Sequence, residues 1–374
     1  MNRGRVTTEG LADGRPGREA TTGSAGAVGG NGAVGGNGAV GGNGAVGGNG
    51  AVDGAPAGRR PAGRGRRGKH RDEPKFGSYY GLPVLNKPTW EGRDIAGYFF
   101  LGGLAGASSV VAAGAQATGR PGLARGAKVG AAAAIGLSLA ALVHDLGRPA
   151  RFVNMLRVFK VTSPMNMGSW LLTLYGPAAF AAAGSELTGI APAVGLAATA
   201  GAAVIGPAIA AYTAALVTNT AVPSWHDGYR EMPFVFVSSG ASAAAGLGLL
   251  AAPLGENAPV RRLAAVAGPA ELVISKVMEH RMGMVAEPYH EGKAKWYLRA
   301  AEALTVAGVA GAVTLGRRNR LAAALSGAAL IVGSAATRFG IFHAGVQSAE
   351  DPRYTVVPQR RRLEAAGSPG NAAG

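Results

Sequence analysis

The sequence predicts an all-α integral membrane protein with eight transmembrane helices and a disordered, glycine-rich N-terminal tail. Hydrophobic residues make up 48% of the chain and charged residues only 16%, which is low against the roughly 25% of soluble domains. Beyond residue 94 the apolar residues gather in eight long segments. Most of these segments approach the ~20 residues that a helix needs to cross a bilayer. The residues before them are polar, basic and rich in glycine.

The N-terminal region contains a short repeat. From Gly26 the hexapeptide Gly-Ala-Val-Gly-Gly-Asn occurs four times, up to Asn49. Its apolar side chains are too few to offset the entropy lost on ordering the chain. We therefore interpret residues 1–75 as a disordered, low-complexity tail that acts as a flexible tether, in preference to a repeating fold.

The end of this tail is strongly basic. The run from Arg59 to Arg71 has no interleaved aromatic residues for stacking on bases, so it favours a solvated cytoplasmic segment over a nucleic-acid site. The next region, residues 76–94, contains Tyr79 and Trp90, whose amphipathic rings are typical of the membrane interface. We expect an ordered interfacial segment there.

The transmembrane domain is assigned to residues 95–345, and residues 346–374 form a C-terminal tail. The predicted spans are 95–116, 126–144, 167–187, 191–217, 234–252, 260–280, 296–316 and 320–342. An even number of spans places both termini on one side of the membrane, called side A below. Side A also receives the long loops, and side B receives only short links. Because side A holds most of the Lys and Arg residues, the positive-inside rule predicts that it is the cytoplasmic face of the plasma membrane.

The chain has no cysteine, which excludes thiolate ligation of an iron–sulfur cluster by this polypeptide. Its six histidines lie in the tail, in loops or at the ends of predicted helices. A b-type haem needs axial histidines on facing helices inside the bilayer, and the sequence offers no such pair. No histidine spacing indicates a metal site. We therefore expect this chain to bind no haem, iron–sulfur cluster or metal.

Ionisable residues inside membrane segments are candidates for function because they are costly there. In the sixth segment Glu271, Ser275 and Glu279 recur every four residues and share a helix face, with Lys276 beside them. This group is either a proton path or an internally paired ion cluster that orients helices. Arg338 in the eighth segment is predicted to extend its guanidinium to the surface of side A rather than to reach a buried anion.

Two polar motifs flank the loop between the second and third spans, on side A. They are His144-Asp145-Leu146-Gly147-Arg148-Pro149 and Ser163-Pro164-Met165-Asn166-Met167-Gly168-Ser169-Trp170. A second polar cluster on this side combines Trp225-His226-Asp227-Gly228 with Arg230-Glu231. A ligand with an apolar tail and a head group that exchanges protons suits such a site. A quinone fits this description, although spacing alone does not single it out.

Together with Tyr98-Phe99-Phe100-Leu101-Gly102-Gly103-Leu104-Ala105-Gly106, these two motifs resemble the NrfD/PsrC family of polysulfide-reductase-type membrane subunits. The resemblance covers about Tyr79 to Tyr354. It implies an eight-helix subunit, without bound redox centres, that exchanges electrons between menaquinone and a ferredoxin-like iron–sulfur subunit of a molybdopterin oxidoreductase. The Ala- and Gly-rich sequence resembles the actinobacterial formate-dehydrogenase-associated type, so formate is the expected electron donor.

The resemblance places the quinone head group near side A. The candidate quinone-binding residues are His144, Asp145, Arg148, Asn166 and Trp170, with Asp94 at the start of the first helix as a candidate that matches no motif. Arg148 is either a quinone ligand or a latch to a helix C-terminus. We assign no catalytic residue. Two other functions stay open, namely a secondary transporter or ion-translocating protein with Glu271, Lys276 and Glu279 on its path, and a purely structural anchor.

Overall fold

The computed structural model describes residues 85, 88, 92–146 and 150–367. The chain divides into two units, Met1–Val84 and Leu85–Gly374, and every described residue belongs to the second. The predicted tail, most of the predicted interfacial segment and the candidate Arg148 lie outside the described residues.

The described part of the chain is helical and contains no strand. Each predicted span coincides with a long α-helix: α3 (Gly92–Ala117), α4 (Pro121–Leu146), α6 (Pro164–Thr188), α7 (Pro192–Thr218), α9 (Met232–Ala251), α10 (Ala258–Met282), α11 (Gly292–Val313) and α12 (Arg320–Glu350). The shorter elements are α5 (Ala150–Met155), α8 (Pro223–His226), the 3-10 helices η1 (Gly283–His290) and η2 (Leu315–Arg317), and α13 (Arg353–Gly367). Five helices, α3, α4, α7, α9 and α12, are long and apolar enough to cross a membrane. The prediction of an all-helical membrane protein is confirmed to that extent.

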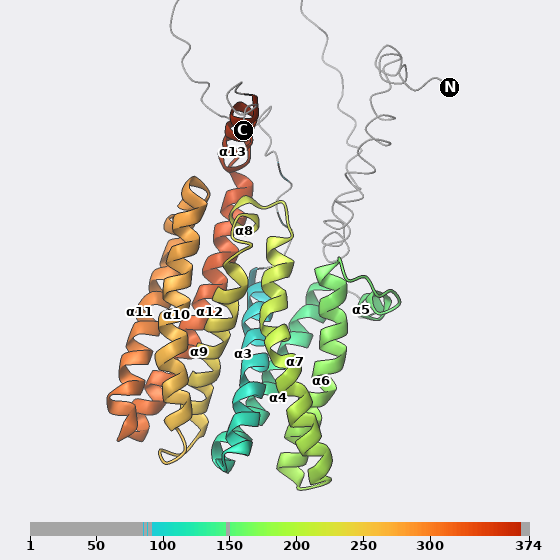
Figure 1. Cartoon of the computed structure of the whole chain (residues 1–374), viewed down its shortest axis with the longest axis vertical. Coiled ribbons are helices and arrows are strands. Elements are labelled where there is room, and N and C mark those ends of the chain that lie inside the picture. Colours follow the sequence, from blue (N-terminus) through green and yellow to red (C-terminus); the bar gives the residue numbers. More distant parts are fainter. Residues whose placement is uncertain (1–84, 86–87, 89–91, 147–149, 368–374) are drawn as a thin grey trace, which may run out of the picture. The chain divides into compact units, whose positions relative to one another are not determined.

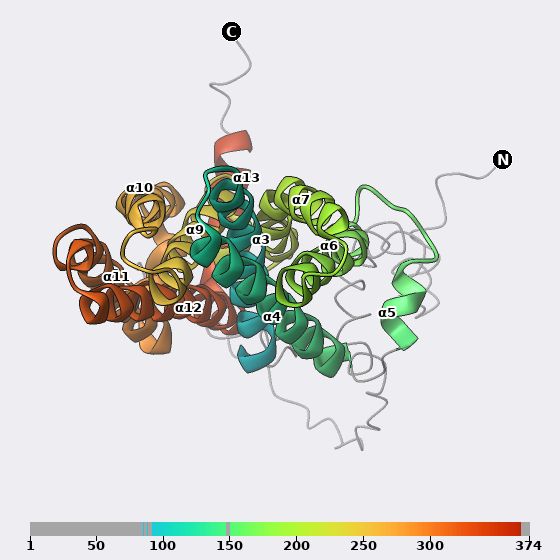
Figure 2. The same ribbon diagram turned by 90° about the horizontal axis from the view of Figure 1, so that it is seen from below.

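Helix α3 occupies the centre of the bundle. It packs against α4 and α7 on one side and against α9 and α12 on the other, while α10 and α11 extend the second group (Figures 1 and 2). Its first turn and the last turn of α4 lie at the end of the bundle that carries α5 and α8 (Figure 1). This end corresponds to side A.

Close helix crossings depend on paired glycines. A Cβ atom on Gly106 of α3 would lie 2.2 Å from the carbonyl oxygen of Gly206 on α7. On the opposite side of α3, a Cβ on Gly240 of α9 would lie 2.9 Å from the carbonyl oxygen of Gly103. One helix, α3, thus approaches two neighbours closely, because backbones come this near only where side chains are absent.

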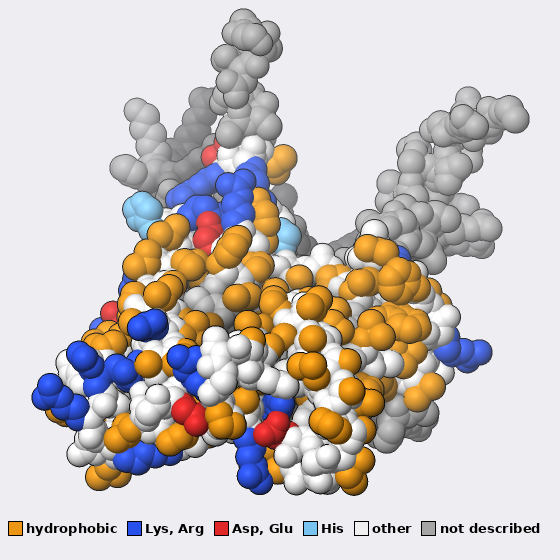
Figure 3. Space-filling view, turned by 60° about the horizontal axis from the view of Figure 1, so that its bottom comes forward, with side chains coloured by type: hydrophobic (Ala, Val, Ile, Leu, Met, Phe, Trp, Pro, Cys, Tyr) orange, Lys and Arg blue, Asp and Glu red, His pale blue; other side chains and the backbone are white. Residues whose placement is uncertain are grey.

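The outward surface of the bundle is apolar. Figure 3 shows hydrophobic side chains spread over it, with Lys and Arg gathered mainly toward its ends. Helices α6, α10 and α11 are not among the five candidate spans. Large apolar side chains point outward from these three helices as well. These include Leu174 and Phe180 on α6, Val266 and Val273 on α10, and Val306 on α11.

The prediction for Arg338 is wrong. Helix α12 continues to Glu350, eight residues beyond the predicted end at residue 342, so Arg338 lies three turns inside the helix rather than one turn from its end. Its side chain is fully buried, and Nη2 donates to the carbonyl oxygen of Phe236 at 2.7 Å. The extended helix also takes up the first residues assigned to the C-terminal tail, and α13 covers much of the rest.

The connection between α7 and α9 is joined to α10 by a pair of charges. Arg281 donates to both oxygens of Glu231, at 2.7 Å from Nε and 2.5 Å from Nη2. These hydrogen bonds hold the pKa of Glu231 below its usual range. The stability that the pair contributes is therefore present above the unfolded-state pKa of about 4.3 and is lost as the pH falls through the lower folded-state value.

We therefore expect the unfolding temperature of the detergent-solubilised protein to drop more steeply below about pH 4 than that of Glu231→Gln, which lacks the titrating group. The measurement is thermal unfolding followed by circular dichroism across the acid range. Parallel pH curves for the two proteins would show that the pair adds nothing to stability.

Candidate functional site

An ion pair between α3 and α4 joins two of the sequence-predicted site residues. The Nδ1 atom of His144 lies 2.5 Å from Oδ2 of Asp94. The Asp94 side chain is 17% exposed and the His144 side chain is 75% exposed, so the pair has a sheltered carboxylate and an accessible imidazole. The candidate that matched no motif is thus in direct contact with the first residue of the polar loop motif.

The ends of the two helices explain why charges gather at this point. Asp94 lies in the first turn of α3 and His144 in the last turn of α4. The partial positive charge of a helix N-terminus favours a carboxylate, and the partial negative charge of a C-terminus favours an imidazolium. Leu146 is fully buried two residues beyond His144, which fixes the end of α4 while His144 faces outward. Asp145, between them, is half-buried.

Asn166 and Trp170, from the second motif, hold the loop that follows α5. The amide nitrogen of Asn166 donates to the carbonyl oxygens of Met155 at 2.5 Å and Val158 at 2.7 Å, and its amide oxygen accepts from the backbone N–H of Lys160 at 2.7 Å. Trp170 Nε1 donates to the same Val158 carbonyl at 3.2 Å. The structure therefore uses the polar atoms of both side chains to shape the loop.

Replacing Asn166 by alanine removes three of these hydrogen bonds. Each contributes ~0.5–1.5 kcal/mol, so we expect amide hydrogen exchange over residues 155–160 to become about ten times faster or more. Asn154→Ala is the matched control, because its side chain is exposed on α5. Equal exchange rates in the two variants would contradict the conclusion that Asn166 holds this loop in place.

A buried tyrosine links the second motif to α3. A Cβ atom on Gly168 would lie 2.4 Å from Cε2 of Tyr212, so the glycine of this motif leaves room for the Tyr212 ring. That ring packs edge-on against Tyr98, with 6.2 Å between centroids, and Tyr98 lies one turn beyond Asp94 on α3. The Tyr212 hydroxyl is buried and has no hydrogen-bond partner among the described residues. It is therefore an available polar atom in the same half of the bundle.

The second polar cluster on side A is largely structural. Trp225 is buried and its Nε1 donates to the carbonyl oxygen of Ile341 at 2.8 Å. A Cβ atom on Gly345 would lie 1.9 Å from the indole, so α12 provides a slot for this ring. The neighbouring Ser224 donates through Oγ to the carbonyl oxygen of Val285 at 2.8 Å. These contacts fasten the α7–α9 connection to α12 and η1.

The predicted face of the sixth segment divides into an interior and a surface part. Glu271 is buried and accepts a 2.7 Å hydrogen bond from Thr337 Oγ1. Lys276 lies at the surface, where its Nζ is 3.3 Å from Glu279 Oε2 and 3.9 Å from Glu302 Oε2. The three candidates of the proposed proton path therefore do not form one ion cluster.

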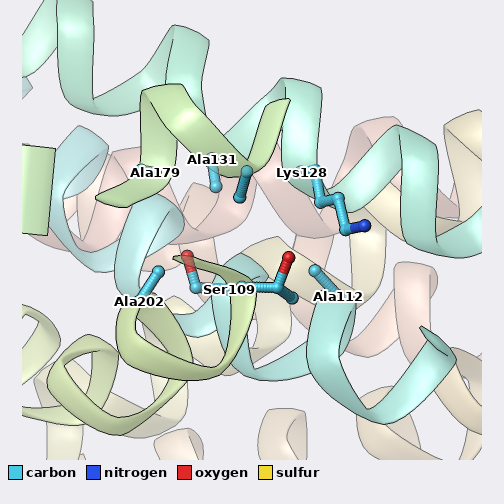
Figure 4. A pocket seen from close by; sticks show the side chains of 8 residues that line it. Ser109, Ala112, Lys128, Ala131, Ala179 and Ala202 are labelled. Atoms are coloured by element: carbon cyan, nitrogen blue, oxygen red, sulfur yellow. The ribbon is translucent and has the colours of Figure 1, made fainter. Parts of the chain in front are cut away.

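A buried ion pair near side B was not predicted from the sequence. Lys128 of α4 is buried and its Nζ lies 2.7 Å from Glu186 Oε2 on α6. A cavity of about 10 Å³ lies beside it, near Ser109, whose Oγ is 2.7 Å from the Tyr175 hydroxyl (Figure 4). This volume is close to that of one water molecule. Lys128 and Glu186 each lie inside a predicted span. Because a charged side chain is costly in a membrane, their presence there was the signal that could have identified the pair.

Within the described residues, no group of three His, Asp or Glu side chains is placed to hold a metal ion. No curated protein matches the chain. A family model described as "Polysulphide reductase, NrfD" matches residues 83–258, a range that includes α3 to α9 and ends at the first residue of α10. This range contains the Asp94–His144 pair, the loop fastened by Asn166 and Trp170, and Tyr212. Members of this family are membrane subunits of quinone-linked oxidoreductases. Residues 83–258, just under half of the chain, thus match the NrfD family.

Proposed function

We propose that the chain is a quinone-reactive membrane anchor whose quinone site lies on side A, beside the Asp94–His144 ion pair. The observation that carries this proposal is the 2.5 Å contact between Asp94 and His144, which combines a sheltered carboxylate with an accessible imidazole at one end of the bundle. Reduction of a quinone takes up two electrons and two protons, and oxidation of the quinol releases them. A site for this chemistry needs groups that donate hydrogen bonds to carbonyl oxygens and exchange protons.

The side chains present fit this requirement. Histidine changes its protonation near neutral pH and can accept or donate a proton. Asp94 orients the imidazole through its contact with Nδ1. The buried Tyr212 hydroxyl, which lacks a partner among the described residues, is a further hydrogen-bond donor in this half of the bundle. Asn166 and Trp170 are assigned a positioning role, because their polar atoms shape the loop.

The finer assignments follow from the family resemblance. We propose menaquinone as the quinone, a ferredoxin-like iron–sulfur subunit as the direct electron partner on side A, and a molybdopterin enzyme, formate dehydrogenase, as the source of electrons. A chain without cysteine must leave iron–sulfur clusters to its partners, which supports a subunit of a larger complex. His144 is exposed enough to lie close to a docked subunit.

We also propose that α6, α10 and α11 complete eight spans in the plasma membrane. They contain 25, 25 and 22 residues, and a helix of 22 residues is about 33 Å long, enough to cross a hydrocarbon core of about 30 Å. Their outward valine, leucine and phenylalanine side chains support contact with lipid. The cytoplasmic orientation of side A rests on the basic loops and termini there.

Deletion of the chain tests the proposed role. Membranes that lack it are expected to oxidise formate with artificial electron acceptors but to lose menaquinone reduction. Retained menaquinone reduction contradicts the role. In cells that do not oxidise formate, the deletion could instead abolish menaquinone reduction by the substrate of another molybdopterin enzyme. That result would show that formate is not the electron donor, but it would support the role of the subunit.

A further inference from the structure

A second buried polar group lies between α9, α10 and α12, on the far side of α3 from α7. It centres on Glu271, 2% exposed, and Arg338, 0% exposed. Glu271 is the fourteenth residue of the 25 in α10, so it lies near mid-depth. Arg338 packs over the Phe236 ring, with Cζ 3.8 Å from the ring centroid. Neither residue belongs to the region matched by the NrfD family model.

The hydrogen bonding of this group is incomplete among the described residues. Glu271 Oε2, Arg338 Nε, Arg338 Nη1 and Ser242 Oγ are buried without a partner. Glu271 and Arg338 also form no ion pair within 4.0 Å. Buried polar atoms without partners are costly, and they are commonly satisfied by internal water. The geometry points to water that bridges the carboxylate and the guanidinium across this gap.

The charges facing Glu271 are few. Helix α9 packs against α10 and carries no charged side chain, but it brings the hydroxyls of Ser239 and Ser242. On α11, Glu302 is directed to Lys276 at the surface. Arg338 on α12 is thus the formal charge that interacts with Glu271 in the interior. An ionised Glu271 neutralises it, and a protonated Glu271 leaves the arginine charge uncompensated.

A polar route connects this interior group with side A. Glu271, Ser275 and Glu279 follow one face of α10, and eight residues of helix span about 12 Å. The Glu279 side chain is 11% exposed, and its Oε2 lies 3.5 Å from Nε2 of His290. His290 is 60% exposed at the end of η1. Exposure therefore rises stepwise from the buried carboxylate to the surface.

We propose that Glu271 is an internal proton-binding site that exchanges protons with side A through Ser275, Glu279 and His290. In the loading step the Glu271 carboxylate takes a proton from bridging water and becomes a neutral carboxylic acid, and the water is replenished by a proton from the Glu279–His290 end. Release reverses these transfers. Lys276 lies outside this route, on the exposed surface of α10. The site goes beyond the quinone site on α3 and α4 and requires no property of it.

Infrared difference spectroscopy of the full chain in nanodiscs, without quinone, tests this proposal. Stepping the pH is expected to change a band in the C=O stretching region of protonated carboxylic acids. Glu271→Gln should abolish that band, whereas Glu302→Gln, which removes a surface carboxylate, should leave it. Absence of a titrating band in the wild-type protein would show a Glu271 that stays in one protonation state and only orients helices, and would overturn the proposal even if Glu271→Gln failed to fold.

A second measurement tests the proton route from Glu271 to side A. Transfer of the wild-type protein into D2O shifts the band as the carboxylic proton exchanges, and Glu279→Gln is expected to slow that shift at least tenfold. His280→Ala, also at the side-A end of α10, is the matched control and should not slow it. Unchanged exchange in Glu279→Gln would overturn the route through Glu279. Because no quinone is present, failure of the quinone site and failure of this proton site remain distinguishable.

Discussion

Replacing Gly106 by valine is expected to unfold or severely destabilise the bundle. The new Cβ atom alone would lie 2.2 Å from the Gly206 carbonyl oxygen, which is backbone and cannot rotate away. Overpacking a tight core commonly costs ~1–3 kcal/mol and more where the backbone must move. Helix α3 also contacts α4, α9 and α12, so a shift of α3 disturbs both halves of the bundle.

The matched control is Gly114→Val on the same helix, because a Cβ atom on Gly114 meets nothing within 4 Å. The measurements are the yield of monodisperse protein in detergent and its unfolding temperature. We expect Gly106→Val to lose most of the folded yield and Gly114→Val to keep it. Equal losses in the two variants would contradict the crossing of α3 and α7 at Gly106 and Gly206.

Asp94→Asn is expected to reduce the rate of quinone reduction by about 10²–10⁴, the usual contribution of a positioned acid or base. The amide keeps the shape of the carboxylate but carries no charge and cannot exchange a proton at this position. Assembly of the complex and substrate oxidation with artificial acceptors should be unchanged, since both depend on other surfaces and centres. A quinone reduction rate equal to wild type would remove Asp94 from the site.

A double-mutant cycle shows whether Asp94 and His144 act together. The combined variant Asp94→Asn/His144→Gln should lose little more than the more damaging single variant, because residues that work as a unit have non-additive effects. Glu302→Gln, a carboxylate at the outer surface of α11, is the control and should leave quinone reduction unchanged. Strictly multiplicative losses would indicate two independent roles.

Hydrophobic segment length predicted the positions of the long helices well, because a bilayer fixes the length of an apolar helix. It failed at the end of α12. The polar residues after Phe342 are not typical of a transmembrane segment. None of them ends the helix, however, which continues up to Asp351 and Pro352. That one boundary changed the interpretation of Arg338 from a surface cation to a buried one.

The grouping of the candidate residues was predicted only in part. The motifs identified His144, Asn166 and Trp170 as candidates. Only the structure shows that His144 pairs with Asp94, whereas Asn166 and Trp170 form hydrogen bonds with the backbone of the loop. Asp94 and His144 are fifty residues apart, and no periodicity within one helix reports a contact between two helix ends. Tyr212 carried no sequence signal of its own, because its position depends on the space left by Gly168.

Photoaffinity labelling with an azido-substituted menaquinone tests the central claim most directly. The probe is irradiated with the intact complex in membranes, and labelled peptides of this chain are mapped by mass spectrometry. We predict labels on the side-A ends of α3 and α4, within 92–98 and 138–146, which fade when unlabelled menaquinone competes. Competable labels confined to α10, α11 and α12 would contradict a quinone site at Asp94 and His144.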